Sequence, residues 1–449
     1  MKTQTLRIIL ILILVSTLFG TVLIILPKNS QIPKEKQIEV ELLSKQTLKL
    51  ETLEDLDELI ERTKNKKYVL LGESSHGTSE YYLWRAKISQ RLITENNFSF
   101  IAIEGDWPNI YNINRYVKLM DNTFSTGQNS LAMADRWPQW MWANEEFLEL
   151  VEWVREYNKD LPITKRVGIY GMDMQHPEES INQAIERLLE INSDLGEEIS
   201  KAYNCLKEYD ADMQRYAQAH FSNQVSCQDK TVNALKKFDT VYSEKDVLDS
   251  EKLFEIRQNI LAVEYAEEYA RALVVEDSQS WNTRVNYMKE TIGNLSDKYQ
   301  DNSKGIIWAH NTHVGDAKAT QMTEVGMVNI GQLLREKYLQ ENIFIVGFGT
   351  YQGQVIASFQ WGGNLQKLNL PKAISGSIES FLKEIKKPSF IFFLDEDNLP
   401  QRFTQKLGHR AKGVVYNPAQ DQNHYVPTIL KDRYDSFIFI KTTTALTPL

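Results

Sequence analysis

Short apolar runs separated by longer amphipathic stretches dominate the pattern of this chain from about residue 60 onward. The first two runs, 67–72 and 99–103, are too short for helices and favour buried strands. Residues 78–96 between them have helical spacing, and Thr78 is a candidate N-cap. A strand, a helix and a second strand form a βαβ unit, so we expect two parallel strands that end at the same edge of a sheet.

The strand pattern continues on the far side of a long helical stretch. Residues 166–173 predict a third strand, and 178–302 then contain almost no Gly or Pro and show helical spacing. Beyond them we predict a helix at 330–339 and strands at 305–309, 343–350, 354–359, 389–394, 412–416 and 436–441.

These elements predict an α/β fold with a mostly parallel sheet and flanking helices, interrupted by a large helical insertion. In this division, 51–177 and 303–449 are the two parts of one α/β catalytic domain, and 178–302 form the insertion.

The N-terminus predicts a membrane anchor. Residues 8–26 carry no charge, follow Lys2 and Arg7, and are long enough to span a bilayer. The stretch is long for a signal-peptide core and lacks a clear cleavage site, so an uncleaved signal anchor is favoured over a cleaved peptide. We therefore predict a transmembrane signal anchor within 1–30, a polar tether at 31–50, and a membrane-anchored protein with an extracytoplasmic catalytic domain.

Composition, net charge and cysteine spacing bear on the size of the core, on nucleic-acid binding and on metal or disulfide sites. A chain of 449 residues, 42% apolar and 25% charged, can bury a sizeable core. The formal net charge of −9 and the lack of a basic run with interleaved aromatics argue against a nucleic-acid partner. Cys205 and Cys227 are the two cysteines; their spacing predicts no zinc site and leaves one disulfide open if the chain is exported.

Polar side chains follow three of the predicted strands. Because the carboxyl ends of parallel strands meet at the edge where α/β sheets bind ligands, we expect these side chains to converge. They are Glu73, His76, Glu104, His310 and His313.

The helix at 78–96 adds a sixth group, Arg85, which lies on its apolar face. A guanidinium there needs an acidic partner, either as part of the site or as a buried ion pair without a catalytic role.

This set of side chains suits two kinds of hydrolysis. In the first, a carboxylate fixes the tautomer of His76, which takes a proton from water that attacks an acyl carbon, and Arg85 or His310 assists the oxyanion or the leaving oxygen. In the second, the histidines and acids bind a divalent metal that activates the water. Neither G-x-S-x-G nor HExxH occurs, so we favour the first kind, without a serine nucleophile, metal or cofactor.

The segment after Glu104 is dense in aromatic residues, which line either an apolar substrate cleft or the core. The predicted substrate-binding residues of this segment are Trp107, Trp137 and Trp142, and Arg284 and Asp316, from two of the sequence blocks given next, complete the predicted set.

Seven ordered blocks of sequence point to a known family. They are GESSHG at 72–77, IEGDW at 103–107, WPQWMW at 137–142, GIYGMD at 168–173, SWNTR at 280–284, WAHNTHVGD at 308–316 and NIGQL at 329–333. With these blocks the chain resembles the erythromycin esterase family over about 60–449, and more closely the erythromycin esterase-like homologues described as succinoglycan biosynthesis proteins.

The resemblance implies a hydrolase that opens an ester, in the named members the lactone of a macrolide, with a histidine that activates water. Carried over by motif, His76 is the general base and Glu73 its acidic neighbour; Arg85, Glu104, His310 and His313 complete the catalytic set. The aromatic segment and the helical insertion match the broad homologues rather than the macrolide-cleaving members, which leaves the substrate open. A metal-dependent hydrolase and a membrane-anchored binding protein for a hydrophobic ligand remain as alternatives.

Overall fold

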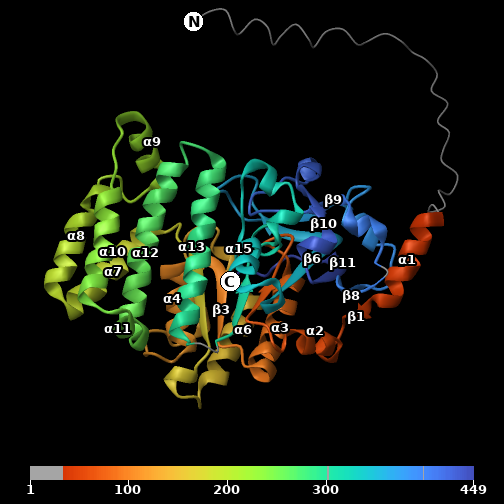
Figure 1. The fold of residues 1–449 in the computed structure, drawn as a ribbon, viewed down its shortest axis with the longest axis horizontal. Helices are drawn as coiled ribbons and strands as arrows, with labels where there is room; N and C mark the ends of the chain where they lie inside the picture. Colours follow the sequence, from red (N-terminus) through yellow and green to blue (C-terminus); the bar gives the residue numbers. More distant parts are fainter. Residues whose placement is uncertain (1–33, 301–302, 398) are drawn as a thin grey trace, which may run out of the picture. The chain divides into compact units, whose positions relative to one another are not determined.

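A nine-stranded sheet, buried except at β1 and most of β7, lies at the centre of residues 39–449 (Figure 1). The computed structural model describes residues 34–300, 303–397 and 399–449. The strands follow the spatial order β1-β8-β11-β6-β2-β5-β3-β4, and β7 pairs with β6. Their bounds are β1 Leu48–Lys49, β2 Tyr68–Leu71, β3 Phe100–Asp106, β4 Gly168–Asp173, β5 Gly305–Trp308, β6 Ile343–Ala357, β7 Gln366–Leu370, β8 Ser389–Phe393 and β11 Ser436–Thr443.

The strands from β11 to β4 in this order pair in parallel, whereas β1, β7 and β8 pair antiparallel. Apolar side chains alternate between two cores. Val69 and Leu71 of β2 belong to one core, with α3 (Ser79–Asn96) and α6 (Glu145–Asn158), and Tyr68 belongs to the other. Helices on both faces are what a buried, mostly parallel sheet requires. The α/β part of the fold prediction agrees with this arrangement.

The second core lies under helices from the stretch between β4 and β5, where the described residues form helices and connecting turns only (Figure 1). These helices are α7 Pro177–Ile191, α8 Ser193–Lys207, α9 Met213–Asn223, α10 Gln228–Val241, α11 Glu244–Asp249, α12 Glu251–Ala272 and α13 Asp277–Lys298. A disulfide joins Cys205 in α8 to Cys227, the residue before α10.

The remaining helices connect strands or flank the sheet. Besides short 3-10 turns, they are α1 Lys34–Gln46, α2 Asp57–Thr63, α4 Trp107–Val117, α5 Gly127–Leu131, α14 Asn311–Val314, α15 Ile330–Tyr338, α16 Ile378–Leu382 and α17 Leu430–Arg433. Both α1 and β1 lie within the segment predicted as a tether, and β1 pairs with β8. The described residues of that segment therefore contain secondary structure, which corrects the prediction there.

Two strand predictions also differ from the structure. The runs 343–350 and 354–359 form one strand, β6, because its polar middle pairs with β11 through Gln352 and Gly353. Residues 412–416 form no strand; instead β9 (Lys406–Arg410) and β10 (Tyr425–Ile429) make a separate antiparallel pair. Backbone pairing of polar residues leaves no hydrophobic signal, which explains the first difference. In the second, residues 412–416 make only isolated bridges, and β10 contains a proline, which argues against a strand in the sequence.

Within the described ranges no helix is long and apolar enough to cross a membrane. The longest, α12 and α13, have 22 residues each, but charged side chains recur along both, whereas a span needs about 20 mostly apolar residues. The stretch 8–26, where the sequence predicts a signal anchor, lies outside the described residues. We therefore withdraw the transmembrane segment, the membrane as a partner and the extracytoplasmic location, which no described helix supports.

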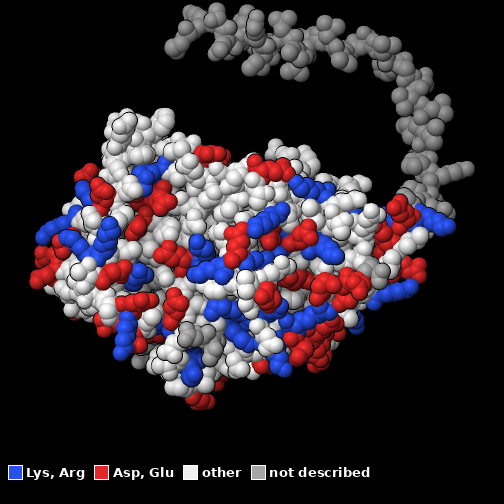
Figure 2. All heavy atoms as spheres, viewed as in Figure 1, with Lys and Arg blue, Asp and Glu red and all other residues white. Residues whose placement is uncertain are grey.

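Basic and acidic side chains are interspersed over the face of residues 39–449 shown in Figure 2. This face has no extended positive area of the kind that binds a phosphate backbone. The exclusion of a nucleic-acid partner stays a prediction.

Candidate active site

Two glycines shape the turn that follows β2. A Cβ at Gly72 would collide with the side chain of Asn311, and a Cβ at Gly77 would collide with the backbone of Ile356 in β6. The backbone N–H of Asn311 donates to the carbonyl of Glu73 at 2.8 Å. These contacts hold the turns after β2 and β5 against each other, so that the residues at 73–76 and 310–313 lie side by side.

His76 contacts a carboxylate through one ring nitrogen and leaves the other available. Its Nδ1–H donates to Glu73 Oε1 at 2.9 Å, and Arg85 Nη2 donates to Glu73 Oε2 at 2.7 Å. All three residues are buried. The Nε2 atom of His76 has no hydrogen bond to the described residues, and the residue lines a cavity. Glu73 thus fixes the neutral tautomer with its lone pair on Nε2.

The pKa of His76 results from opposing effects. Burial lowers it, but the hydrogen bond to Glu73 and the charges of Glu104 and Glu73 outweigh burial, and the pKa is raised from its ordinary value of 6.5. Such a histidine is a stronger base than free imidazole, as a general base requires.

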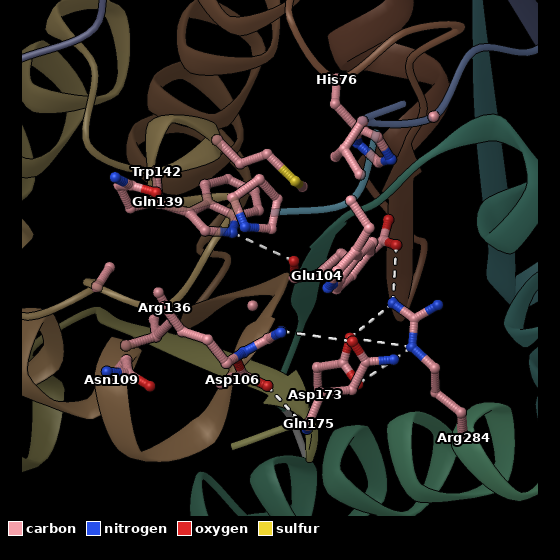
Figure 3. A pocket seen from close by; sticks show the side chains of 18 residues that line it. His76, Glu104, Asp106, Asn109, Arg136, Gln139, Trp142, Asp173, Gln175 and Arg284 are labelled. Carbon is pink, nitrogen blue, oxygen red and sulfur yellow. Dashed lines mark hydrogen bonds and ion pairs between the residues drawn. The ribbon is translucent and has the colours of Figure 1, made fainter. Parts of the chain in front are cut away.

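A second cluster surrounds Glu104 (Figure 3). Its Oε1 accepts from Arg284 Nη2 at 3.0 Å and lies 3.1 Å from His313 Nε2. Its Oε2 accepts from the backbone N–H of His310 at 2.9 Å. Arg284 also donates to Asp173, at 2.6 Å through Nη2. Glu104 in β3 is therefore linked directly to the turn after β5, and through Arg284 to Asp173 at the end of β4. Glu73 is the carboxylate that contacts His76.

The charges in this cluster depend on one another. Burial raises the pKa of Glu104, but the charge and hydrogen bond of His313 and the charges of His76 and Arg284 together hold it well below its ordinary value of 4.5. Arg284 Nη1 lies 3.2 Å from the same His313 Nε2. A guanidinium only donates and a carboxylate only accepts, so His313 Nε2 either accepts from Arg284 or donates to Glu104, according to the tautomer of His313.

His310 differs from His76 although their ring centroids are 4.9 Å apart. The backbone N–H of Thr312 donates to His310 Nδ1 at 3.2 Å, which places the proton of the neutral ring on Nε2. Burial, and after it the charge of His76, hold the pKa of His310 well below 6.5. His310 is thus a neutral ring beside the more basic His76.

The strand ends open into a cavity of about 210 Å³ (Figure 3). Its charged or titratable lining residues are His76, Glu104, Asp106, Arg136, Asp173 and Arg284. Apolar walls come from Ile110, Ala134, Met141, Trp142 and Val414. A small cavity with charged and apolar walls and a basic histidine is suited to proton transfer between that histidine and a bound molecule.

Three residues predicted to bind substrate do not line this cavity. Trp107 is fully buried and stacks on Tyr170 at 5.8 Å, so it belongs to the core. Asp316 lies 3.2 Å from Arg335 in a separate charged pocket. Trp137 contacts Trp361, which lines the cavity, but is not itself in the wall. Trp142 and Arg284 do line it.

Several lining residues are absent from the sequence prediction. Arg136 donates to Asp106 at 2.5 Å and precedes a block of the family resemblance, which is the signal that could have found it. Trp361 lies in a Trp-Gly-Gly turn, which predicts a loop but not its position.

Among the described residues, no group of three or more His, Cys, Asp and Glu side chains is arranged to hold a metal ion. The metal-dependent alternative therefore needs an experimental test.

A sequence model for erythromycin esterase matches residues 93–443. The chain belongs to the erythromycin esterase family. YbfO of Bacillus subtilis (strain 168), named as a candidate hydrolase, is 24% identical over 410 residues, which cover 86% of this chain and 86% of YbfO. Family membership and this relative support a hydrolytic function.

Solved structures share the fold of this family member. A Bacillus cereus protein has a TM-score of 0.75 at 19% identity, covering 94% of this chain and 100% of that one. A succinoglycan biosynthesis protein has a TM-score of 0.74 at 20% identity with the same coverage. A mutant of the erythromycin esterase EreC in its open conformation has a TM-score of 0.63 at 14% identity, covering 89% and 97%.

Proposed function

We propose that this member of the erythromycin esterase family hydrolyses a carboxylic ester or lactone, with His76 as the general base that activates water. One observation carries the proposal: His76 contacts Glu73 through Nδ1 at 2.9 Å, and the Nε2 of the same ring is available at the cavity wall. The erythromycin esterase EreC, which shares the fold, supports an ester bond as the target.

In the first step, a water molecule in the cavity gives a proton to His76 Nε2 as its oxygen attacks the acyl carbon. The imidazolium that forms is stabilised by Glu73, whose second oxygen is neutralised by Arg85 at 2.7 Å. Arg85 is fully buried behind Glu73, so its role is to hold the carboxylate rather than to contact substrate.

The oxyanion that forms on the acyl oxygen requires hydrogen-bond donors. Arg136 and Arg284 are the cationic side chains in the cavity wall, and both are anchored by carboxylates, Asp106 and Asp173. Because the wall also carries these carboxylates and Glu104, the two guanidiniums act as fixed N–H donors to the oxyanion rather than through a net positive charge. The tetrahedral species then collapses, the acyl–oxygen bond breaks, and His76 returns its proton to the leaving oxygen.

A panel of lactones and simple esters tests this function with the wild type beside His76→Ala, each with and without EDTA. We expect hydrolysis that EDTA does not affect and that falls by about 10² to 10⁴ in His76→Ala. Full activity in the variant would refute the mechanism. Activity that EDTA abolishes would point to a metal-dependent hydrolase, and no turnover at all would point to a binding protein.

A further inference from the structure

The small cavity adjoins a larger one. The second cavity, of about 800 Å³, lies between the end of β4 and the helical stretch, and it shares Arg136, Gln175 and Trp361 with the first. Its apolar lining residues include Met174, Met213, Ala266, Tyr269 and Leu273. The two cavities therefore meet at these three shared side chains.

The first cavity alone is small for a substrate. Ligand sites in proteins commonly measure about 300–1,000 Å³, whereas this one has about 210 Å³. It can hold an ester group with short substituents, so any larger part of a substrate has to extend into the adjoining space.

Of the three shared side chains, two are committed to polar partners. Arg136 donates to Asp106 at 2.5 Å, and its Nη2 donates to the side-chain oxygen of Gln175 at 3.4 Å. Trp361 has no hydrogen bond from its indole to the described residues and is 58% exposed. It is the large apolar surface at the junction that is open for contact.

The ring of Trp361 is nevertheless held in place. Its centroid lies 4.5 Å from that of Trp137, with the planes at 61°. Trp137 Nε1–H in turn donates to the carbonyl of Gly363 at 3.1 Å, and Gly362 has a φ of +69°, which a side chain would strain. Trp137 thus fixes the turn that carries Trp361, and a fixed aromatic ring loses little entropy when a ligand packs on it.

We propose that Trp361 binds the larger, non-reacting part of a bulky ester or lactone that presents an apolar face, at the junction of the two cavities. The substrate class is an ester too large for the first cavity, with its reacting carbonyl beside His76 and its apolar body on Trp361. This proposal rests on the proposed function.

Two lactones of different size test it: δ-valerolactone and ω-pentadecanolactone, followed by acid release in a pH-stat. We expect Trp361→Ala to lower the ratio of kcat/KM for the large over the small lactone by about tenfold or more, mainly through KM, and Trp361→Phe to restore most of it. Phe359→Ala is the matched control, because Phe359 is 55% exposed on the same turn and lines neither cavity. An unchanged ratio in Trp361→Ala, or an equal loss in Phe359→Ala, would overturn the proposal.

A binding measurement separates this proposal from the proposed function. Calorimetry measures the affinity for ω-pentadecanolactone of His76→Ala and of the double variant His76→Ala/Trp361→Ala. Because hydrolysis is removed in both, the difference between them reports on the Trp361 ring. If adding Trp361→Ala lowers the affinity about tenfold, the role of Trp361 is supported. If the wild type shows no hydrolysis that depends on His76, only the proposed function is refuted. Equal affinity, or no binding by either protein, would refute the role of Trp361.

Discussion

Glu73 influences His76 in two ways that an experiment can separate. It orients the ring through the 2.9 Å contact with Nδ1, and it raises the pKa of His76 against the effect of burial. Because the base must be neutral to accept a proton, activity is expected to fall as the pH drops through a pKa above 6.5.

Glu73→Gln tests this relation. The substitution removes a negative charge, so the pKa of His76 should fall and the acid limb of the kcat/KM profile should move to lower pH. The plateau should also fall, by about 10² or more, because the imidazolium loses its carboxylate. The measurement is the pH profile with one lactone, beside Glu95→Gln, an exposed site near the end of α3, which should leave the profile unchanged. A plateau that falls while the acid limb stays in place would contradict the electrostatic role.

Single residues differ in how far the sequence could predict their place. Glu73, Glu104 and His310 follow or end strands, and parallel strand ends converge whatever the loops do, so the sequence pattern was enough to bring them together. Trp107 and Trp142 both belong to the aromatic-rich segment of the sequence, yet Trp107 lies in the core and Trp142 in the cavity wall. That difference depends on how the helices pack, which no local pattern contains.

Strands and helices with a continuous apolar pattern were predicted well. The helix expected at 78–96 is α3, Ser79–Asn96, although Thr78 makes no side-chain cap and its hydroxyl instead contacts Ser75. The strands β9 and β10 were missed because β9 is largely polar, β10 contains a proline, and pairing between segments apart in sequence decides both.

Helix α12 contains a buried acid that the hydrophobic pattern conceals. Glu255 is 5% exposed, and the nearest cation is Arg187, whose Nε is 3.8 Å away. Burial raises the pKa of Glu255 from 4.5 to about 7. The folded chain therefore keeps this proton after the unfolded chain has lost it, so the contribution of Glu255 to stability falls as the pH rises from 4.5 to about 7.

Glu255→Gln should remove that dependence, because the amide resembles the protonated acid. At 1.36 kcal/mol for each pH unit, the interval from 4.5 to about 7 corresponds to about 3 kcal/mol. Between about pH 4 and about pH 8, the free energy of unfolding of the variant should rise by this amount relative to the wild type. Urea unfolding at the two pH values measures it, with Glu268→Gln, exposed on the same helix, as the control. A stability difference between variant and wild type that is the same at both pH values would contradict the prediction.

In residues 39–449 as a whole, the sheet and the helical stretch contribute different parts of the candidate site. Strand ends carry the proposed chemistry in the smaller cavity, while the stretch between β4 and β5 supplies much of the wall of the larger one. The residues at 210–215, which lead into the first turn of α9, belong to that wall. If a large substrate binds as proposed, the stability of this segment affects how that substrate is held.

The disulfide between Cys205 and Cys227 constrains this segment, since the two residues are 22 apart in sequence and enclose α9. Closing a loop of that length in the unfolded chain is expected to stabilise the protein by about 3 kcal/mol. The double variant Cys205→Ser/Cys227→Ser should lose this amount in urea unfolding, and a reductant should destabilise the wild type equally but leave the double variant unchanged. Because α9 forms part of the larger cavity, the same variant should hydrolyse ω-pentadecanolactone less well than δ-valerolactone relative to the wild type. Equal stability of the oxidised wild type and the double variant would show that the constraint contributes nothing to the fold.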